Sequence, residues 1–425
     1  MPDKQEHLSR REFVKRGAIA TASVTAFNIL KSPEARAAVP LKVGLIGCGG
    51  RGRGAAQDIL KASKDVSVVA MTDLFQDRLE RAQKELKEKM GVTVDPSMCF
   101  LGWDGYKKVL ATNVDIVILA TPPVFRPETL TAAVEAKKHV FMEKPAAVDA
   151  PGIRAIMEAG KKAKSLGLAI VAGTQRRHQN KYVETIRRIR DGACGEIMAA
   201  RAYWCGGPIG FYERKPEYSD VEYQLRCWYH FLWLSGDHIV EQHVHNLDVI
   251  NWAMGMHPVK AFGYGGRAWQ IHGDIWDHHT VDFEFENGVH LSSMCRQIPN
   301  CVHDVSEFVV GTKASSNCAD WIRGKGAEWK FEGETQNPYV QEHADLIASI
   351  REGQPLNEAQ NVAESTMTAI MGRMAEYSGQ VVTWEEALKS EENLRPEKIQ
   401  LGPMPPRPIA VPGGKEYAGE GWMPG

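Results

Sequence analysis

A glycine-rich motif, Gly-Cys-Gly-Gly-Arg-Gly, occupies positions 47–52. Small residues at this spacing suit phosphate binding, because they let main-chain N–H groups approach an anion closely. In such a motif Gly47 permits the tight turn, Gly49 lets the backbone approach a pyrophosphate, and Gly52 lets a helix pack on a strand. The motif therefore predicts a dinucleotide site, whose loop residues are Gly47, Gly49, Gly50, Arg51 and Gly52.

An acidic residue follows at the distance that dinucleotide binding requires. Asp73 ends the next apolar run, VSVVAMTD, where a carboxylate accepts a hydrogen bond from the ribose 2′-OH. A carboxylate at this place repels the 2′-phosphate of NADP, so the predicted cofactor is NAD. Thr121 and Pro122, at the end of a later apolar run, are assigned to the same site. The alternative is a glycine-rich turn with an unrelated surface aspartate.

A second set of residues suits proton transfer. Glu143 and Lys144 precede Pro145 at a strand end, on the sheet edge where open α/β sheets bind ligands, so both are assigned to the cofactor. Glu241 and His245 are four residues apart and are predicted to share one helix face. On that face the carboxylate would raise the basicity of the imidazole, and His245 would act as general base on a sugar hydroxyl.

Plainer interpretations of these residues stay open. A Lys-Pro pair at a strand end also occurs in solvated turns, and Glu241 with His245 could be a helix-capping cluster. A metal site using His243 and His245 would be strained, because the two side chains point in different directions on a helix. No third ligand is identified, so no metal is assigned.

Aromatic and polar residues between the two sets predict a carbohydrate site. Aromatic faces suit the apolar faces of pyranose rings, and arginine suits hydroxyl or carboxylate groups. Two segments of the sequence contain such residues. A strand end that should face the cleft precedes Gln175, Arg176 and His178, and the aromatic segment contributes Trp228, Tyr229 and His230. These six residues and His245 are assigned to substrate binding.

The elements that position these residues alternate between strand and helix over the first part of the chain. Short apolar runs alternate with helical stretches of about 10–15 residues, a pattern typical of βαβ units and a doubly wound parallel sheet. The strands are expected at 41–47, 66–73, 114–123, 139–145 and 168–175, and the helices at 55–63, 77–90, 127–137 and 151–165.

The pattern changes after about residue 180. Asn287-Gly288 between two strand-like runs predicts a β-hairpin. The second half is therefore predicted to be an α+β domain on a largely antiparallel sheet. The strands are expected at 196–204, 259–267, 281–286, 289–296 and 308–311, and the late helices at 340–352 and 359–378. The predicted domains are 38–178 (NAD-binding), 179–400 (substrate and oligomerisation) and 401–425 (a Pro/Gly-rich arm).

Taken in order, these motifs resemble the Gfo/Idh/MocA family (glucose-fructose oxidoreductase and inositol dehydrogenase) over about residues 41–390. The resemblance implies that Lys144 contacts substrate and nicotinamide. In the family the Lys-Pro peptide bond at this place is often cis. It also implies that His245 is the base and that Glu241 helps to bind or orient. The chain has Glu241 and His243 where the family more often has Asp and Gly. Dimers or tetramers formed through the open sheet face are implied as well.

The N-terminus predicts export. Ser9-Arg10-Arg11-Glu12-Phe13-Val14-Lys15, an apolar stretch and Ala35-Arg36-Ala37 together resemble a twin-arginine (Tat) signal over residues 1–37. Because this route carries folded proteins, the expected location is periplasmic or otherwise extracytoplasmic.

Composition limits the partners. The 425 residues carry a formal net charge of −2, which favours neither nucleic acid nor an anionic membrane surface, and beyond the signal no run is long enough for a membrane span. The expected partners are a small carbohydrate and further copies of the chain. The eight cysteines form no CxxC pair and are interpreted as small core residues, although Cys295 and Cys301 could pair.

The leading functional hypothesis is an NAD-dependent oxidoreductase that acts on a hydroxyl of a sugar, cyclitol or glycoside and retains and recycles its cofactor. One alternative is a glycoside hydrolase or lyase that oxidises C3 transiently and then eliminates. A non-catalytic sugar-binding protein is the other alternative, and the joint presence of Lys144, Glu241 and His245 argues against it.

Overall fold

The computed structural model describes residues 39–269 and 272–413. The predicted signal at 1–37 lies outside this range, as do residues 414–425 of the predicted arm. No helix in the described ranges is long and apolar enough to cross a membrane. All eight cysteines fall inside these ranges and are free, Cys295 and Cys301 among them.

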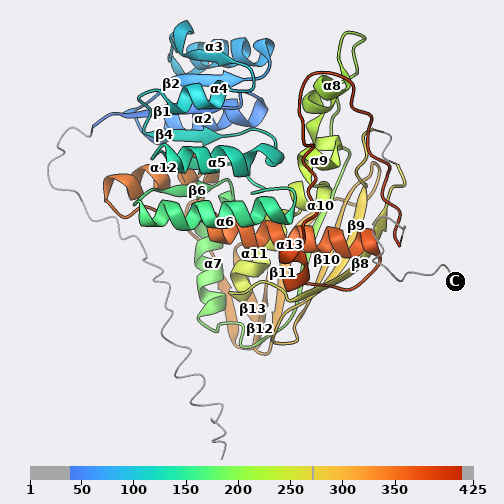
Figure 1. Ribbon diagram of the computed structural model, residues 1–425. Helices are drawn as coiled ribbons and strands as arrows, with labels where there is room; N and C mark the ends of the chain where they lie inside the picture. The colour runs from blue at the N-terminus through green and yellow to red at the C-terminus, as the bar shows by residue number, and fades with distance from the viewer. Residues whose placement is uncertain (1–38, 270–271, 414–425) are drawn as a thin grey trace, which may run out of the picture. The chain divides into compact units, whose positions relative to one another are not determined.

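The first half folds around a parallel six-stranded sheet with the order β3-β2-β1-β4-β5-β6 (Figure 1). Its order reverses between β1 and β4, so the carboxyl ends of these strands border a crevice. The strands are β1 (Leu41–Ile46), β2 (Val66–Asp73), β3 (Cys99–Leu101), β4 (Ile116–Leu119), β5 (His139–Met142) and β6 (Ile170–Ala172).

Helices cover both faces of this sheet because alternate strand residues point to opposite sides. Val43 and Leu45 of β1 pack in one apolar cluster with α2, α3 and α12, whereas Ile46 packs in another with α4, α5 and α6. The helices are α2 (Gly50–Ala62), α3 (Gln76–Met90), α4 (Gly105–Leu110), α5 (Arg126–Glu135), α6 (Ala150–Ser165) and α12 (Pro338–Arg351), with 3₁₀ turns η1 (Pro96–Met98), η2 (Pro123–Phe125) and η3 (Gln175–His178).

The second half is built on a mixed nine-stranded sheet, order β14-β13-β12-β11-β7-β10-β9-β8-β15. Only β7 and β10 pair in parallel, and the other neighbours are antiparallel. The predicted hairpin joins β9 to β10, with Gly288 at a positive φ of 80°. The strands are β7 (Ile197–Gly206), β8 (Lys260–Gly266), β9 (His278–Glu284), β10 (His290–Gln297), β11 (Asp304–Gly311), β12 (Ala314–Ser316), β13 (Trp321–Gly324), β14 (Ala327–Lys330) and β15 (Val382–Thr383).

The predicted fold class is therefore confirmed: a doubly wound parallel sheet is followed by a largely antiparallel one. The short strands β3 and β12 to β15 were not anticipated. The remaining helices are α7 (Asn180–Arg190), α8 (Asp220–Arg226), α9 (Leu232–Ser235), α10 (His238–Glu241), α11 (Val244–Met254), α13 (Ala359–Ser378) and α14 (Trp384–Lys389), with the 3₁₀ turn η4 (Trp228–His230).

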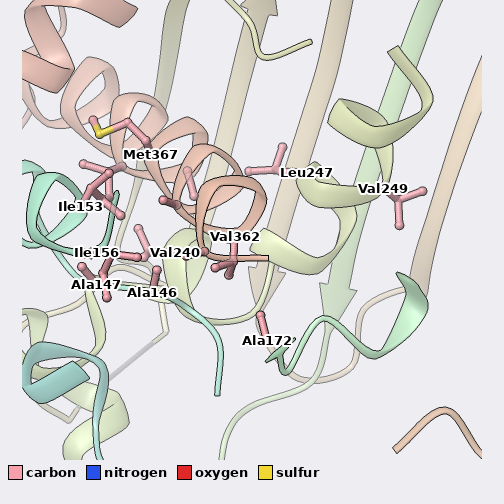
Figure 2. Packing of buried hydrophobic residues seen from close by; sticks show 14 of the residues in the cluster. Ala146, Ala147, Ile153, Ile156, Ala172, Val240, Leu247, Val249, Val362 and Met367 are labelled. Atoms are coloured by element: carbon pink, nitrogen blue, oxygen red, sulfur yellow. The ribbon is translucent and has the colours of Figure 1, made fainter. Parts of the chain in front are cut away.

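Two late helices connect the halves. The α12 helix packs on α2 of the parallel sheet, and the chain after it runs beside β6, where the Ile170 N–H donates to the Leu356 carbonyl at 2.8 Å. The α13 helix packs on α6, α11 and β8. Figure 2 shows this shared core, in which Ile153 of α6, Met367 of α13 and Leu247 of α11 belong to one buried cluster. The halves thus share a continuous apolar core.

Candidate functional site

The glycine motif forms the turn between β1 and α2, and two of its glycines have no room for a side chain. Gly47 adopts a φ of +98°, and a Cβ there would lie 2.8 Å from the Ala120 carbonyl oxygen. A Cβ on Gly52 would lie 1.9 Å from the Gly47 carbonyl oxygen. Gly49 precedes the first residue of α2 and receives no side-chain cap, so the N-terminus of this 13-residue helix is left for a ligand. This cradle fits a pyrophosphate.

Asp73 is held beside the glycine motif by main-chain donors. The Cys48 N–H donates to its Oδ2 at 2.7 Å, and the Phe75 N–H donates to its Oδ1 at 2.9 Å. Both bonds fix the carboxylate at the end of β2. Each oxygen keeps a second acceptor position, which suits a ribose hydroxyl.

A cavity of about 330 Å³ lies over the carboxyl ends of β1, β2 and β4. Its lining brings together residues that the sequence assigned to the cofactor: Gly47, Gly49, Gly50, Arg51, Asp73, Thr121 and Pro122. The hydroxyl oxygen of Thr121 is buried and has no hydrogen-bond partner in the described chain. The glycine cradle, the fixed carboxylate and this free hydroxyl together fit a bound dinucleotide.

Arg51 turns away from the phosphate cradle towards three carboxylates. Its Nε donates to Glu143 at 2.5 Å, and its other nitrogens reach Asp58 at 3.2 Å and Glu342 of α12 at 3.0 Å. Burial, followed by the neighbouring Glu143, raises the pKa of Glu342 well above its ordinary value. Arg51 therefore joins the glycine motif, the end of β5 and α12 in one buried network.

Lys144 forms a polar contact between the halves. The Lys144–Pro145 bond is cis, as the resemblance implies. The largely buried Lys144 side chain donates from Nζ to the Glu241 carboxylate at 2.8 Å and to the Glu241 carbonyl oxygen at 2.5 Å. A residue that lies just after β5 of the first sheet thus meets the residue that ends α10 of the second half.

The prediction that one helix carries both Glu241 and His245 is wrong. The α10 helix ends at Glu241 and α11 begins at Val244. In a continuous helix the His245 N–H would donate to the Glu241 carbonyl. That carbonyl instead accepts from Lys144, and the His245 N–H donates to Gln242 at 3.3 Å. The carboxylate of Glu241 consequently pairs with the lysine.

The expected effect on the basicity of His245 is also reversed. Burial, then the cations Lys144 and Arg176, lower the pKa of His245 well below its ordinary value. The ring stacks on Trp204 of β7 at a centroid distance of 5.7 Å. His245 is therefore neutral at neutral pH, with a lone pair able to accept a proton.

Buried polar side chains gather around Lys144 and Glu241, among them Tyr229 and His238. Burial, followed by Glu241, raises the pKa of Tyr229 well above its ordinary value, and burial lowers the pKa of His238 to about 3. The hydroxyl, the carboxylate and the neutral imidazole can each donate or accept further hydrogen bonds, so this grouping fits a ligand with several hydroxyl groups.

The other residues assigned to the substrate separate into different places. Arg176 pairs with the buried Glu307 and lies over the Trp204 ring, 5.9 Å from its centroid. Gln175 donates to the Tyr339 hydroxyl at 3.3 Å.

Three of the residues that the sequence assigned to the substrate have their contacts in other parts of the structure. His178 is bound to Asp345 at 2.6 Å, and His230 lies 3.2 Å from the Gly210 carbonyl oxygen. Trp228 lines the nucleotide cavity.

Sequence reasoning did not assign several residues that line this cavity. Some follow β2 or β3, and others come from the last part of the chain. An acidic residue and glycines at a fixed spacing predict a nucleotide-binding loop. The aromatic lining residues, and those near the end of the chain, have no comparable pattern in the sequence. They include Arg78, Trp103, Tyr106, Phe125, Arg395, Glu397 and Ile399.

Comparison with known proteins agrees with this geometry. Residues 41–171 match the GFO_IDH_MocA model, described as an oxidoreductase family with an NAD-binding Rossmann fold. The chain is 25% identical over 256 residues to myo-inositol 2-dehydrogenase of Thermotoga maritima, covering 58% of this chain and 66% of that protein. The matches span about half to two thirds of the length of the curated relatives.

Solved structures share the fold over most of the chain. Scyllo-inositol dehydrogenase of Lactobacillus casei, with bound NAD(H) and scyllo-inositol, superposes with a TM-score of 0.60 at 19% identity, covering 81% of this chain and 99% of that one. Aldose-aldose oxidoreductase of Caulobacter crescentus, complexed with glycerol, gives a TM-score of 0.63 at 19% identity and the same two coverages. Both are similar in fold.

Proposed function

We infer that this chain oxidises a hydroxyl of a sugar, cyclitol or glycoside. Its residues 41–171 match the model of the NAD-binding Rossmann domain of the Gfo/Idh/MocA oxidoreductase family. The observation that carries the inference is the meeting of Lys144 with Glu241, beside a neutral His245, where the two halves join. The inositol dehydrogenases among its relatives support a polyhydroxylated ring as substrate. NAD, when bound, accepts the hydride from the carbon that is oxidised.

His245 supplies the base for this reaction. Burial and the neighbouring cations keep its ring neutral, so it can accept the hydroxyl proton. The same cations disfavour the protonated ring after transfer, which favours passing the proton onward. The stacking on Trp204 fixes the plane of the ring and therefore the direction of its lone pair.

Lys144 positions the substrate oxygen. An ammonium group has three donors, and two of them bind the carbonyl and carboxylate of Glu241. The third is left for the oxygen that loses its proton, where a fixed positive charge stabilises developing negative charge. Glu241 keeps the ammonium in place, and its second carboxylate oxygen can accept from a neighbouring hydroxyl.

Cofactor retention is part of the proposal. If residues 1–37 are a twin-arginine signal, the protein reaches a compartment with little NAD after it has folded. An enzyme that released NADH there would stop after one turnover. We therefore expect bound NAD to be regenerated within the cycle, either by reducing a second sugar or by reducing an eliminated glycoside product.

Hydride transfer is tested with protein that contains NAD. Cyclitols, aldoses and glycosides are added one at a time, and NADH fluorescence is followed in a single turnover. His245→Ala should slow transfer by about 10²–10⁴-fold while NAD binding is unchanged. His290→Ala, an exposed histidine of β10 paired with Asp282, is the matched control. Unchanged transfer in His245→Ala would remove this residue from the mechanism.

A further inference from the structure

The segment after α14 is docked along its length although its described residues contain no helix or strand. We call residues 390–410 the C-terminal strap. In Figure 1 it is the dark red trace that runs beside α9 and α8 and then returns. The sequence predicted an irregular Pro/Gly-rich arm only from residue 401 onward, and residues 390–400 were assigned to the second domain without a predicted element.

One end of the strap is fixed to the parallel-sheet half. Leu394 is buried, and its N–H donates to the Asp149 carboxylate at 2.9 Å. The next side chain, Arg395, donates to Glu128 of α5 at 2.6 Å and lies 5.8 Å from the Phe125 ring centroid. The two consecutive residues Leu394 and Arg395 thus make three contacts that attach the strap to the nucleotide-binding half.

The other end is fixed to the mixed-sheet half. The Gln224 amide of α8 donates to the Met404 carbonyl at 2.7 Å, and the Trp276 indole N–H donates to the Ala410 carbonyl at 3.0 Å. Arg407 donates to the Leu394 carbonyl at 2.7 Å, which closes the strap into a loop.

Between its two attachments the strap forms a wall of the nucleotide cavity. Arg395, Pro396, Glu397 and Ile399 line it together with Gly49 and Asp73 of the first half and Trp228 of the second. We propose that the C-terminal strap is a retaining element of the dinucleotide site, so that bound NAD exchanges only when residues 395–399 detach. This inference rests on the proposed function, because it assumes that the cavity holds NAD.

The contacts of the strap favour detachment as a local event. Arg395 and Glu128 are each more than one-third exposed, and exposed ion pairs hold a segment only weakly. A segment with few buried side chains can open while the core stays folded. The strap would therefore slow cofactor exchange in both directions.

The test compares exchange rates rather than catalysis. NADH is bound to the full chain, excess NAD is added, and the loss of bound NADH fluorescence gives the dissociation rate. The double variant Arg395→Ala/Arg407→Ala removes the two arginine side chains that attach residues 394–395, and leaves the bond from the Leu394 N–H to Asp149 in place. We expect its dissociation rate to rise at least about tenfold, with a parallel rise in the association rate, since both directions require opening. Lys398→Ala is the matched control: an exposed cation of the strap that does not line the cavity.

Further results separate the possible failures. The amide hydrogens of Arg395 and of residues 397–399 should exchange more slowly in wild type with NADH bound than without it. A folded double variant with the wild-type dissociation rate would overturn the role of the strap and leave the proposed function intact. A wild-type chain that binds no NADH would overturn the proposed function itself.

Discussion

Gly52→Ala tests the phosphate cradle through sterics alone. The added Cβ would lie 1.9 Å from the Gly47 carbonyl oxygen, about 1.5 Å inside an ordinary contact. Because the obstacle is backbone, no rotamer change relieves it, and either the loop or α2 must move. Overpacking of this kind costs about 1–3 kcal/mol, and the helical preference of alanine recovers about 1 kcal/mol. We expect a net loss of up to about 2 kcal/mol in the free energy of unfolding.

The same displacement moves Gly47 and Gly49, so NAD affinity should fall at least about tenfold, which corresponds to 1.4 kcal/mol. Urea unfolding without nucleotide and titration with NADH measure the two effects. Gly50→Ala is the matched control for stability, since a Cβ there meets nothing within 4 Å. It should be neutral or gain about 0.4–1 kcal/mol. If Gly52→Ala matched wild type in both measurements, the close packing of α2 on the loop would be wrong.

Three further predictions concern the site. Asp73→Ser should raise the affinity for NADP relative to NAD, because the carboxylate that repels a 2′-phosphate is gone; a wild type that already prefers NADP would contradict this. Lys144→Ala should reduce hydride transfer by about 10²–10³-fold through loss of the charged donor, measured in single turnovers, and wild-type rates would exclude that role. Burial opposes protonation of His178, but Glu358 and Asp345 raise its pKa to about 10, above the ordinary 6.5. Its stabilising effect is therefore fully present below about pH 6.5 and is lost as the pH rises through 10. The stability difference from His178→Gln should shrink over that range in urea unfolding, and a constant difference would refute the ion pair.

The parallel sheet could be predicted because its signals are local. The apolar run at 66–73 and the helical stretch at 359–378 have the predicted bounds in the structure. The motif Gly47–Gly52 lies between a strand and a helix, as its spacing required. Each of these signals depends on residues within one element and its immediate neighbours, so no tertiary information was needed.

What could not be predicted depends on distant contacts. At the break between α10 and α11 the Glu241 carbonyl accepts from Lys144, 97 residues earlier in the sequence. Helical spacing alone therefore suggested the wrong partner for His245 and the wrong direction of its pKa shift. The placement of α12 on the first sheet and of Arg395 at the cavity likewise joins segments far apart in sequence.

The most direct test of the central claim is the nucleotide content of protein purified without added cofactor. The chain is expressed with its predicted signal, purified and denatured, and the released small molecules are identified by mass spectrometry. We predict about one NAD(H) per chain, held with a dissociation constant in the nanomolar range or below, where release is slow. Protein that carries no nucleotide and binds none on titration would contradict the account.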